Sequence, residues 1–182
     1  TIITEQRKII ISDNATGIER DNVMKVLRNI AHSTKKRGED KGFRGIGRLG
    51  GLGYCSKLIF ETSYYGEPYK SIMTWDAELL KSIINDRNNS EEAVQVLARV
   101  TKLDSEQENV DAHYFRVIME DVTSDELLDV RSVTDYLSMV APIDISSQFI
   151  FKSKINDFIK KNRLTVDTYN IFINNDQIYK PY

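Results

Sequence analysis

Residues 41–53, KGFRGIGRLGGLG, hold six of the nine glycines in this chain of 182 residues. Glycine has no Cβ, so backbone N–H groups in such a stretch can approach a ligand closely, and the chain can adopt positive φ angles at little cost. Consecutive N–H groups at the start of a helix bind phosphate. The stretch predicts either a phosphate-binding loop or a set of tight turns, and the residues before it must decide between the two.

A strand and a polar loop precede the glycine-rich stretch. The run Ile9-Ile10-Ile11 is β-branched throughout and predicts a buried strand at residues 8–12. Small polar residues follow it, and they place Asp13 at the rim of a sheet. A buried carboxylate there can accept a hydrogen bond from an amino group such as that of adenine. A turn followed by a helix N-cap is the alternative, because Asp, Asn and Gly are common turn residues.

Hydrophobic periodicity predicts short helices and strands along the rest of the chain. Asp21 is the expected N-cap of a helix at residues 22–32, and its apolar side chains recur at helical spacing, which predicts one face on the core. These side chains are Val23, Val26, Leu27 and Ile30. Further strands are expected at residues 2–4, 57–63, 69–75, 93–103, 113–121 and 166–173, and further helices within 76–89 and at 132–140 and 154–161.

Charge and cysteine content exclude several classes of protein. The formal net charge is −2, so no global positive field favours nucleic acid. No apolar run approaches the ~20 residues of a membrane span, and no signal peptide is visible. The lone Cys55 excludes a disulfide within the chain and is typical of a reducing compartment, so we expect a cytoplasmic protein without a membrane partner.

Several catalytic and metal-binding motifs are missing. His32 and His113 are too few and too far apart for a zinc site, and Cys55 has no partner. No Gly-x-Ser-x-Gly element indicates an acyl-transfer nucleophile. The glycines are not followed by the Gly-Lys-Ser/Thr of a Walker loop, and they come after a charged loop rather than a strand, unlike a Rossmann site.

Three segments stand in the order of motifs from a known family: DNATGI at residues 13–18, IAHSTKK at 30–36 and FRGIGRLGGLGYCSKLIFET at 43–62. Together they resemble the GHKL ATPases, the superfamily of DNA gyrase, the ninety-kilodalton heat-shock chaperones, histidine kinases and MutL mismatch-repair proteins. Within it the chain is most similar to the chaperone branch and its bacterial relatives. The resemblance covers residues 1–121 well, and residues 136–142 and 171–182 more weakly.

The resemblance implies a site for ATP or ADP. Asp13 matches the carboxylate that binds the adenine amino group, and Gly17 matches the second glycine of the family's Asp-x-Gly-x-Gly pattern, with Ala15 where the first glycine usually stands. The implied nucleotide-binding positions are Asp13, Gly17 and Ile18 in the first motif, Asn29 and Ser33 at the lid helix, and Lys35, Gly42, Arg44, Gly45, Ile46 and Gly47 at the phosphates.

Two family features have no match in this chain. The family carries a Glu that acts as general base and an Asn that holds Mg²⁺ on a helix before the first of these strands. We expect that helix upstream of Thr1, so we predict no catalytic residue and no protein ligand for a metal within the chain, while the implied cofactors are ATP and Mg²⁺. The family's Gly-Thr pair near the adenine is also missing around residues 113–117.

The implied fold is an α/β (α+β) two-layer sandwich of the Bergerat type, with helices over one face of a mixed, mainly antiparallel sheet. We expect an ATP-binding domain at residues 1–145, then a linker and the first elements of a second domain at 146–182. The predicted function is that of a chaperone-like ATPase whose lid closes on ATP, a dimer in full length that acts on protein clients. Two alternatives stay open: a DNA-associated module of the MutL or MORC kind, which only the basic cluster at residues 35–37 supports, and a domain that no longer binds nucleotide.

Overall fold

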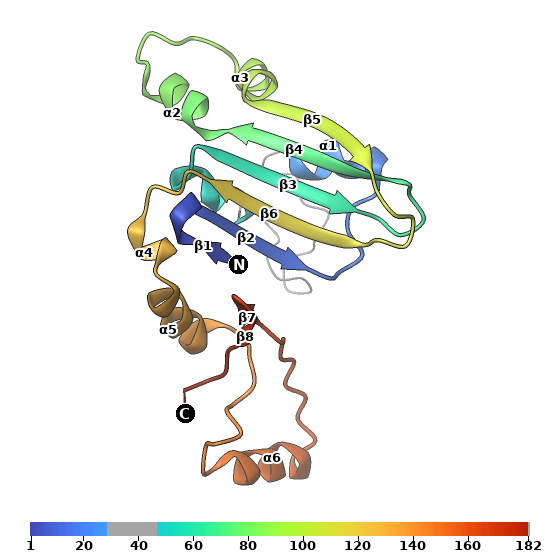
Figure 1. The fold of residues 1–182 in the computed structure, drawn as a ribbon, viewed down its shortest axis with the longest axis vertical. Helices are drawn as coiled ribbons and strands as arrows, with labels where there is room; N and C mark the ends of the chain where they lie inside the picture. The colour runs from blue at the N-terminus through green and yellow to red at the C-terminus, as the bar shows by residue number, and fades with distance from the viewer. Residues whose placement is uncertain (29–46, 182) are drawn as a thin grey trace. The chain divides into compact units, whose positions relative to one another are not determined.

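The computed structural model describes residues 1–28 and 47–181, and it divides the chain into two compact units (Figure 1). The larger unit is Glu5–Ser124, and the smaller unit joins Thr1–Thr4 to Asp125–Tyr182. The predicted domain boundary between residues 145 and 146 stays a prediction. Each unit is described by itself below.

An antiparallel sheet forms the larger unit. Its strands are β2 (Lys8–Asp13), β3 (Lys57–Ser63), β4 (Tyr69–Asp76), β5 (Thr101–Gln107) and β6 (Tyr114–Glu120). They lie in the order β2-β6-β3-β4-β5, and each neighbouring pair is antiparallel. The last strand in sequence, β6, therefore lies between the first two, and it brings residues near 115 next to residues near 13 and 62.

The two faces of this sheet differ. Side chains alternate between the faces along each strand, and one set is fully buried: Leu58 and Phe60 of β3, and Met73 and Trp75 of β4. Helix α1 (Arg20–Leu27) contacts β4, and the 3₁₀ helix η2 (Gly47–Gly53) contacts β3. Figure 1 shows α1 behind the sheet. The α/β two-layer arrangement predicted from the sequence, with helices over one face of the sheet, is confirmed.

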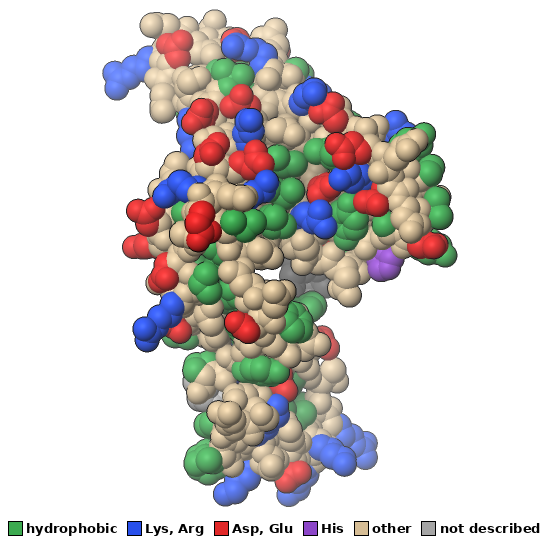
Figure 2. Space-filling model, viewed as in Figure 1, with side chains coloured by type: hydrophobic (Ala, Val, Ile, Leu, Met, Phe, Trp, Pro, Cys, Tyr) green, Lys and Arg blue, Asp and Glu red, His purple; other side chains and the backbone are tan. Residues whose placement is uncertain are grey.

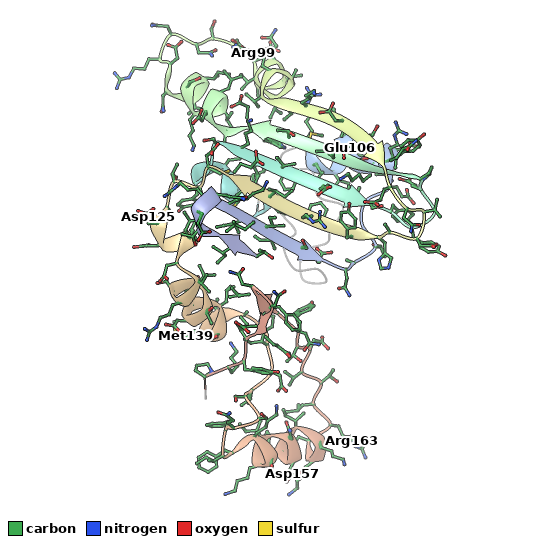
Figure 3. The ribbon with its side chains drawn as sticks, viewed as in Figure 1. Arg99, Glu106, Asp125, Met139, Asp157 and Arg163 are labelled. Atoms are coloured by element: carbon green, nitrogen blue, oxygen red, sulfur yellow. The ribbon has the colours of Figure 1, made fainter. Side chains whose placement is uncertain are left out.

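The opposite face carries charged side chains. Glu61 is only 6% exposed, and it accepts hydrogen bonds from Lys70 and from Arg116 Nη1, the latter at 2.8 Å. Lys70 also lies 3.1 Å from Glu106, which Figure 3 labels on β5. Figure 2 shows acidic and basic side chains interspersed with apolar ones on the face that is in view. The hydrogen bond to Glu61 raises the pKa of Lys70 above its usual range, and paired charges of this kind tie neighbouring strands together.

Helix α1 begins earlier than the sequence predicts. It begins at Arg20 with Glu19 at the N-cap and no side-chain capping bond, so Asp21 lies inside the first turn and the predicted cap is wrong. Val23 and Leu27 are buried as predicted, but Val26 is 41% exposed. The apolar stripe that faces the core is therefore narrower than the i, i+3, i+4 pattern indicated.

The predicted strand at residues 93–103 is wrong for most of its length. Residues Ala93–Val100 form helix α3, and the strand β5 begins only at Thr101 and continues to Gln107, beyond the predicted end of the strand at residue 103. Glu92 donates its backbone N–H to Gln95 Oε1 at 3.3 Å, as in a capping box, which favours a helix start. In a strand, Val94 and Val100 would lie on the same face of the sheet. In the structure Val94 is 69% exposed while Val100 is buried, so the alternation of apolar residues does not mark one buried face.

The helix predicted within residues 76–89 is confirmed as α2 (Ala77–Asn85). Asp76 ends β4 and caps this helix, because its Oδ1 accepts a hydrogen bond from the backbone N–H of Leu79 at 2.9 Å. The strands predicted at 57–63 and 69–75 are confirmed as β3 and β4. No helix in residues 1–28 and 47–181 is both long and apolar enough to cross a membrane.

The smaller unit holds short elements. They are β1 (Ile2–Ile3), α4 (Asp125–Leu128), α5 (Val130–Val140), α6 (Lys152–Lys161), β7 (Phe172–Ile173) and β8 (Asp176–Gln177), while η1 (Thr4–Gln6) follows β1. Asn174 joins the chain ends, because its side chain both accepts from Ile2 N–H at 2.7 Å and donates to Ile2 O at 3.0 Å. The helices predicted at 132–140 and 154–161 are confirmed. The strand predicted at 166–173 is wrong except for its last two residues.

Candidate nucleotide site

Asp13 ends strand β2, at the rim of the sheet as the sequence predicts. Its Oδ1 accepts a hydrogen bond from the backbone N–H of Ala15 at 3.0 Å, the geometry of an Asx turn. The side chain is exposed, which differs from the buried carboxylate expected from the sequence. Because one carboxylate oxygen is used locally, the other is the one that can accept a hydrogen bond from a ligand.

An apolar strip lies beside Asp13 on the same face of the sheet. Strand register places Asp13 opposite Phe115, and Ile11 opposite Val117. The Phe115 ring stacks on the fully buried Phe60, with 5.9 Å between ring centroids. Ile11 is nevertheless 59% exposed, so the apolar surface continues out from the core to the side chain next to the carboxylate. A carboxylate beside exposed apolar surface suits a flat ring that carries an amino group.

Gly17 holds the loop after Asp13 against the sheet. Its φ is +73°, and an ideal Cβ at this position would lie 1.9 Å from the backbone oxygen of Ser63. Real Cβ atoms essentially never lie within 3.0 Å of another heavy atom. The position therefore requires glycine for two separate reasons, which are the left-handed backbone conformation and the close approach to β3.

Two further contacts hold the same loop, and sequence patterns gave no signal for either. The N–H of Ile18 donates to Thr62 Oγ1 at 2.8 Å. His113 Nδ1 lies 3.1 Å from the backbone oxygen of Ala15. The sequence separations are 44 and 98 residues, so local periodicity could not have revealed these partners.

Many of the predicted site residues lie outside the described part of the chain. Four predicted site residues lie within the described part. Asp13, Gly17 and Ile18 lie together, where the end of β2 meets the end of β3 and the start of β6. Gly47 is the first residue of η2, and apart from its chain neighbours no described residue has an atom within 4 Å of the position where its Cβ would be. Those outside are Asn29, Ser33, Lys35, Gly42, Arg44, Gly45 and Ile46. The sequence also predicts that Asp13 and Gly45 face each other across a single cleft, and because Gly45 lies outside the described residues this stays a prediction.

A separate groove of about 330 Å³ runs between α1 and α3. Its described lining consists of Met24, Lys25, Arg28, Val94 and Leu97. None of these side chains is a predicted nucleotide ligand, so the groove is a different place from the rim at Asp13. Among residues 1–28 and 47–181, no three His, Cys, Asp or Glu side chains gather as ligands for a metal.

The antiparallel sheet with helices over one face defines an α/β two-layer domain. The family model described as histidine kinase-, DNA gyrase B-, and HSP90-like ATPase matches residues 2–109, more than half of the chain. The chain therefore belongs to this family, and the superfamily resemblance seen in the sequence is confirmed. The chaperone branch within it stays a prediction.

A comparison with curated protein sequences found no match. Among solved structures, the chain is similar to the ATPase region of Saccharomyces cerevisiae topoisomerase II at 13% sequence identity and a TM-score of 0.45. That match covers 97% of this chain, and the chain spans 41% of the topoisomerase chain.

Proposed function

We propose that this chain is the ATP-binding domain of a chaperone-like GHKL ATPase and that Asp13 binds the adenine. Family membership supports ATP as the ligand. The observation that carries the assignment to this site is the exposed Asp13 carboxylate beside Ile11, which is itself 59% exposed on the covered face of the sheet. A solvent-exposed isoleucine on that face costs hydrophobic free energy that a bound base would recover.

In this proposal the free carboxylate oxygen of Asp13 accepts a hydrogen bond from the exocyclic amino group of adenine. The base lies over Ile11 and Phe115, and the glycine-rich stretch supplies N–H groups to the phosphates. A Mg²⁺ ion bound with the triphosphate would neutralise phosphate charge.

Lid closure is the second part of the proposal. Residues 30–36 resemble the family's lid entry, and closure on ATP requires a contact with the γ-phosphate that ADP cannot make. We expect the whole protein to be a dimer that couples this closure to protein clients. The support for the chaperone branch is the motif resemblance of residues 13–62.

Isothermal titration calorimetry of the whole protein with ATP and ADP, at saturating Mg²⁺, tests nucleotide binding. Asp13→Asn keeps the acceptor for Ala15 N–H but loses the charge, so it should weaken binding by ~1–3 kcal/mol, or about 5- to 150-fold. Asp157→Asn, the same change on α6 of the smaller unit, is the matched control and should bind like the parent. Unchanged affinity in Asp13→Asn would refute the role of Asp13, and no heat with either nucleotide would refute the function.

The chaperone assignment needs a separate measurement. The ATPase rate of the whole protein should rise when an unfolded client protein is added, and it should not rise with duplex DNA. Stimulation by DNA alone, with affinity that falls steeply with salt, would favour the DNA-associated alternative instead.

A further inference from the structure

A single buried hydroxyl connects three parts of the candidate site. Thr62 on β3 is 1% exposed. Its Oγ1 accepts a hydrogen bond from Ile18 N–H at 2.8 Å, and it donates one to the backbone oxygen of Tyr114 at 3.1 Å. The loop after β2, the middle strand β3 and the start of β6 therefore meet at one oxygen atom.

The hydroxyl lies in the same row of the sheet as Asp13. Register pairs Thr62 with Phe115 on one side of β6, and Asp13 with Phe115 on the other. The three side chains share a face because residues directly opposite each other in a sheet point the same way. Thr62 thus stands two strands from the carboxylate, on the face that carries the apolar strip.

The loop between Asp13 and Ile18 is short and is held at both ends. Its first end is set by the pairing of β2 with β6, and its second end by the bond from Ile18 to Thr62. Between them, Gly17 packs against the backbone of Ser63. Loss of the Thr62 bond would release the second end, and the loop that carries the Asx turn at Asp13 would then sample other conformations.

We propose that Thr62 is a positioning residue for the nucleotide site, which holds the loop of residues 13–18 in its binding conformation without touching the ligand. This inference depends on the proposed function, because it names a residue that supports the same site. The hydroxyl's one O–H donor is used within the protein, since Thr62 donates to the Tyr114 carbonyl, and its oxygen also accepts from Ile18 N–H. The half-buried N–H of Ile18 and the half-buried carbonyl of Tyr114 would both lose this partner if the hydroxyl were removed.

Thr62→Val is the informative variant, because valine has nearly the same shape and lacks only the hydroxyl. Its ATP dissociation constant should rise about 10-fold, and Thr62→Ser should restore binding to within about 3-fold of the parent by the same reasoning. Thr62→Ala serves if the valine variant does not fold, since alanine removes the hydroxyl and leaves no branched methyl group against the Tyr114 carbonyl.

Ser63→Ala is the matched control. Ser63 is 0% exposed, and its Oγ donates to the backbone oxygen of Ala112 at 3.1 Å, so the change also removes one buried hydroxyl bond from β3. That bond does not involve the loop after Asp13. Ser63→Ala should therefore lower the free energy of unfolding, because one buried hydroxyl bond is lost, yet leave ATP affinity within about 3-fold of the parent.

Equal weakening of ATP binding by Thr62→Val and Ser63→Ala would overturn the proposal, and so would unchanged binding in Thr62→Val. Amide hydrogen exchange separates this failure from failure of the proposed function. If the parent protein binds no nucleotide, the function fails. The positioning role still predicts faster exchange of the Ile18 amide in Thr62→Val than in Ser63→Ala, and equal exchange would refute it.

Discussion

Gly17→Ala tests the most constrained position of the candidate site. Alanine at φ of +73° costs ~1–2 kcal/mol because its Cβ crowds the backbone in the left-handed region. The new Cβ would also start 1.9 Å from the Ser63 oxygen, where real contacts begin at 3.0 Å, so the backbone must move by about 1 Å. Overpacking of this kind costs a further ~1–3 kcal/mol. We expect a loss of about 2–5 kcal/mol in the free energy of unfolding.

Gly66→Ala is the control for the backbone part of this cost. Gly66 has φ of +89°, but nothing lies within 4 Å of its ideal Cβ, so only the left-handed backbone cost applies, ~1–2 kcal/mol. Urea unfolding followed by tryptophan fluorescence measures both variants, because Trp75 is the one tryptophan in the sequence and is fully buried in the larger unit. Equal losses in the two variants would refute the close approach of Gly17 to Ser63.

Two further predictions concern titratable groups. Burial raises the pKa of the Cys55 thiol to about 11. The folded protein should therefore react negligibly with a disulfide reagent such as DTNB at pH 8, whereas the protein unfolded in urea should react rapidly. Fast reaction without urea would contradict the burial of this thiol. Burial and the hydrogen bond to Glu108 raise the pKa of Tyr114 to about 12, above ~10 in the unfolded chain. The folded state therefore keeps this proton longer, and the resulting stability is present below pH ~10 and lost as pH rises toward 12. Tyr114→Phe should flatten the fall in unfolding free energy between pH 10 and 12, and an unchanged slope would show that Tyr114 is not responsible.

Local sequence signals predicted most strands of the larger unit. β3 and β4 were found within one residue, because each is a β-branched and aromatic run bounded by turn residues. The same signals failed at α3. Its apolar residues at every second position suggested a strand, but the same residues also fit a helix that has one exposed side. A short apolar segment satisfies both periods, and only its packing against the rest of the fold decides between them.

The candidate site was found in part. The strand-end carboxylate Asp13 and the glycine Gly17 were visible because they lie close together in one short motif of the family. Phe115 and Thr62 were not visible. They reach the site through the pairing of β6 with both β2 and β3, and ordinary residue types at distant positions carry no local mark of such pairing.

The sequence by itself indicated the strand at residues 8–12, the motif that contains Asp13 and Gly17, and the membership of the ATPase family. Only the tertiary structure decided that β6 lies between β2 and β3, and hence which ring stands beside the carboxylate and which hydroxyl lies in the same row of the sheet. The physical reason is that the alternation of apolar and polar residues along a strand specifies which face each side chain occupies. Which strands become neighbours depends instead on the hydrogen bonds and packing of the whole sheet.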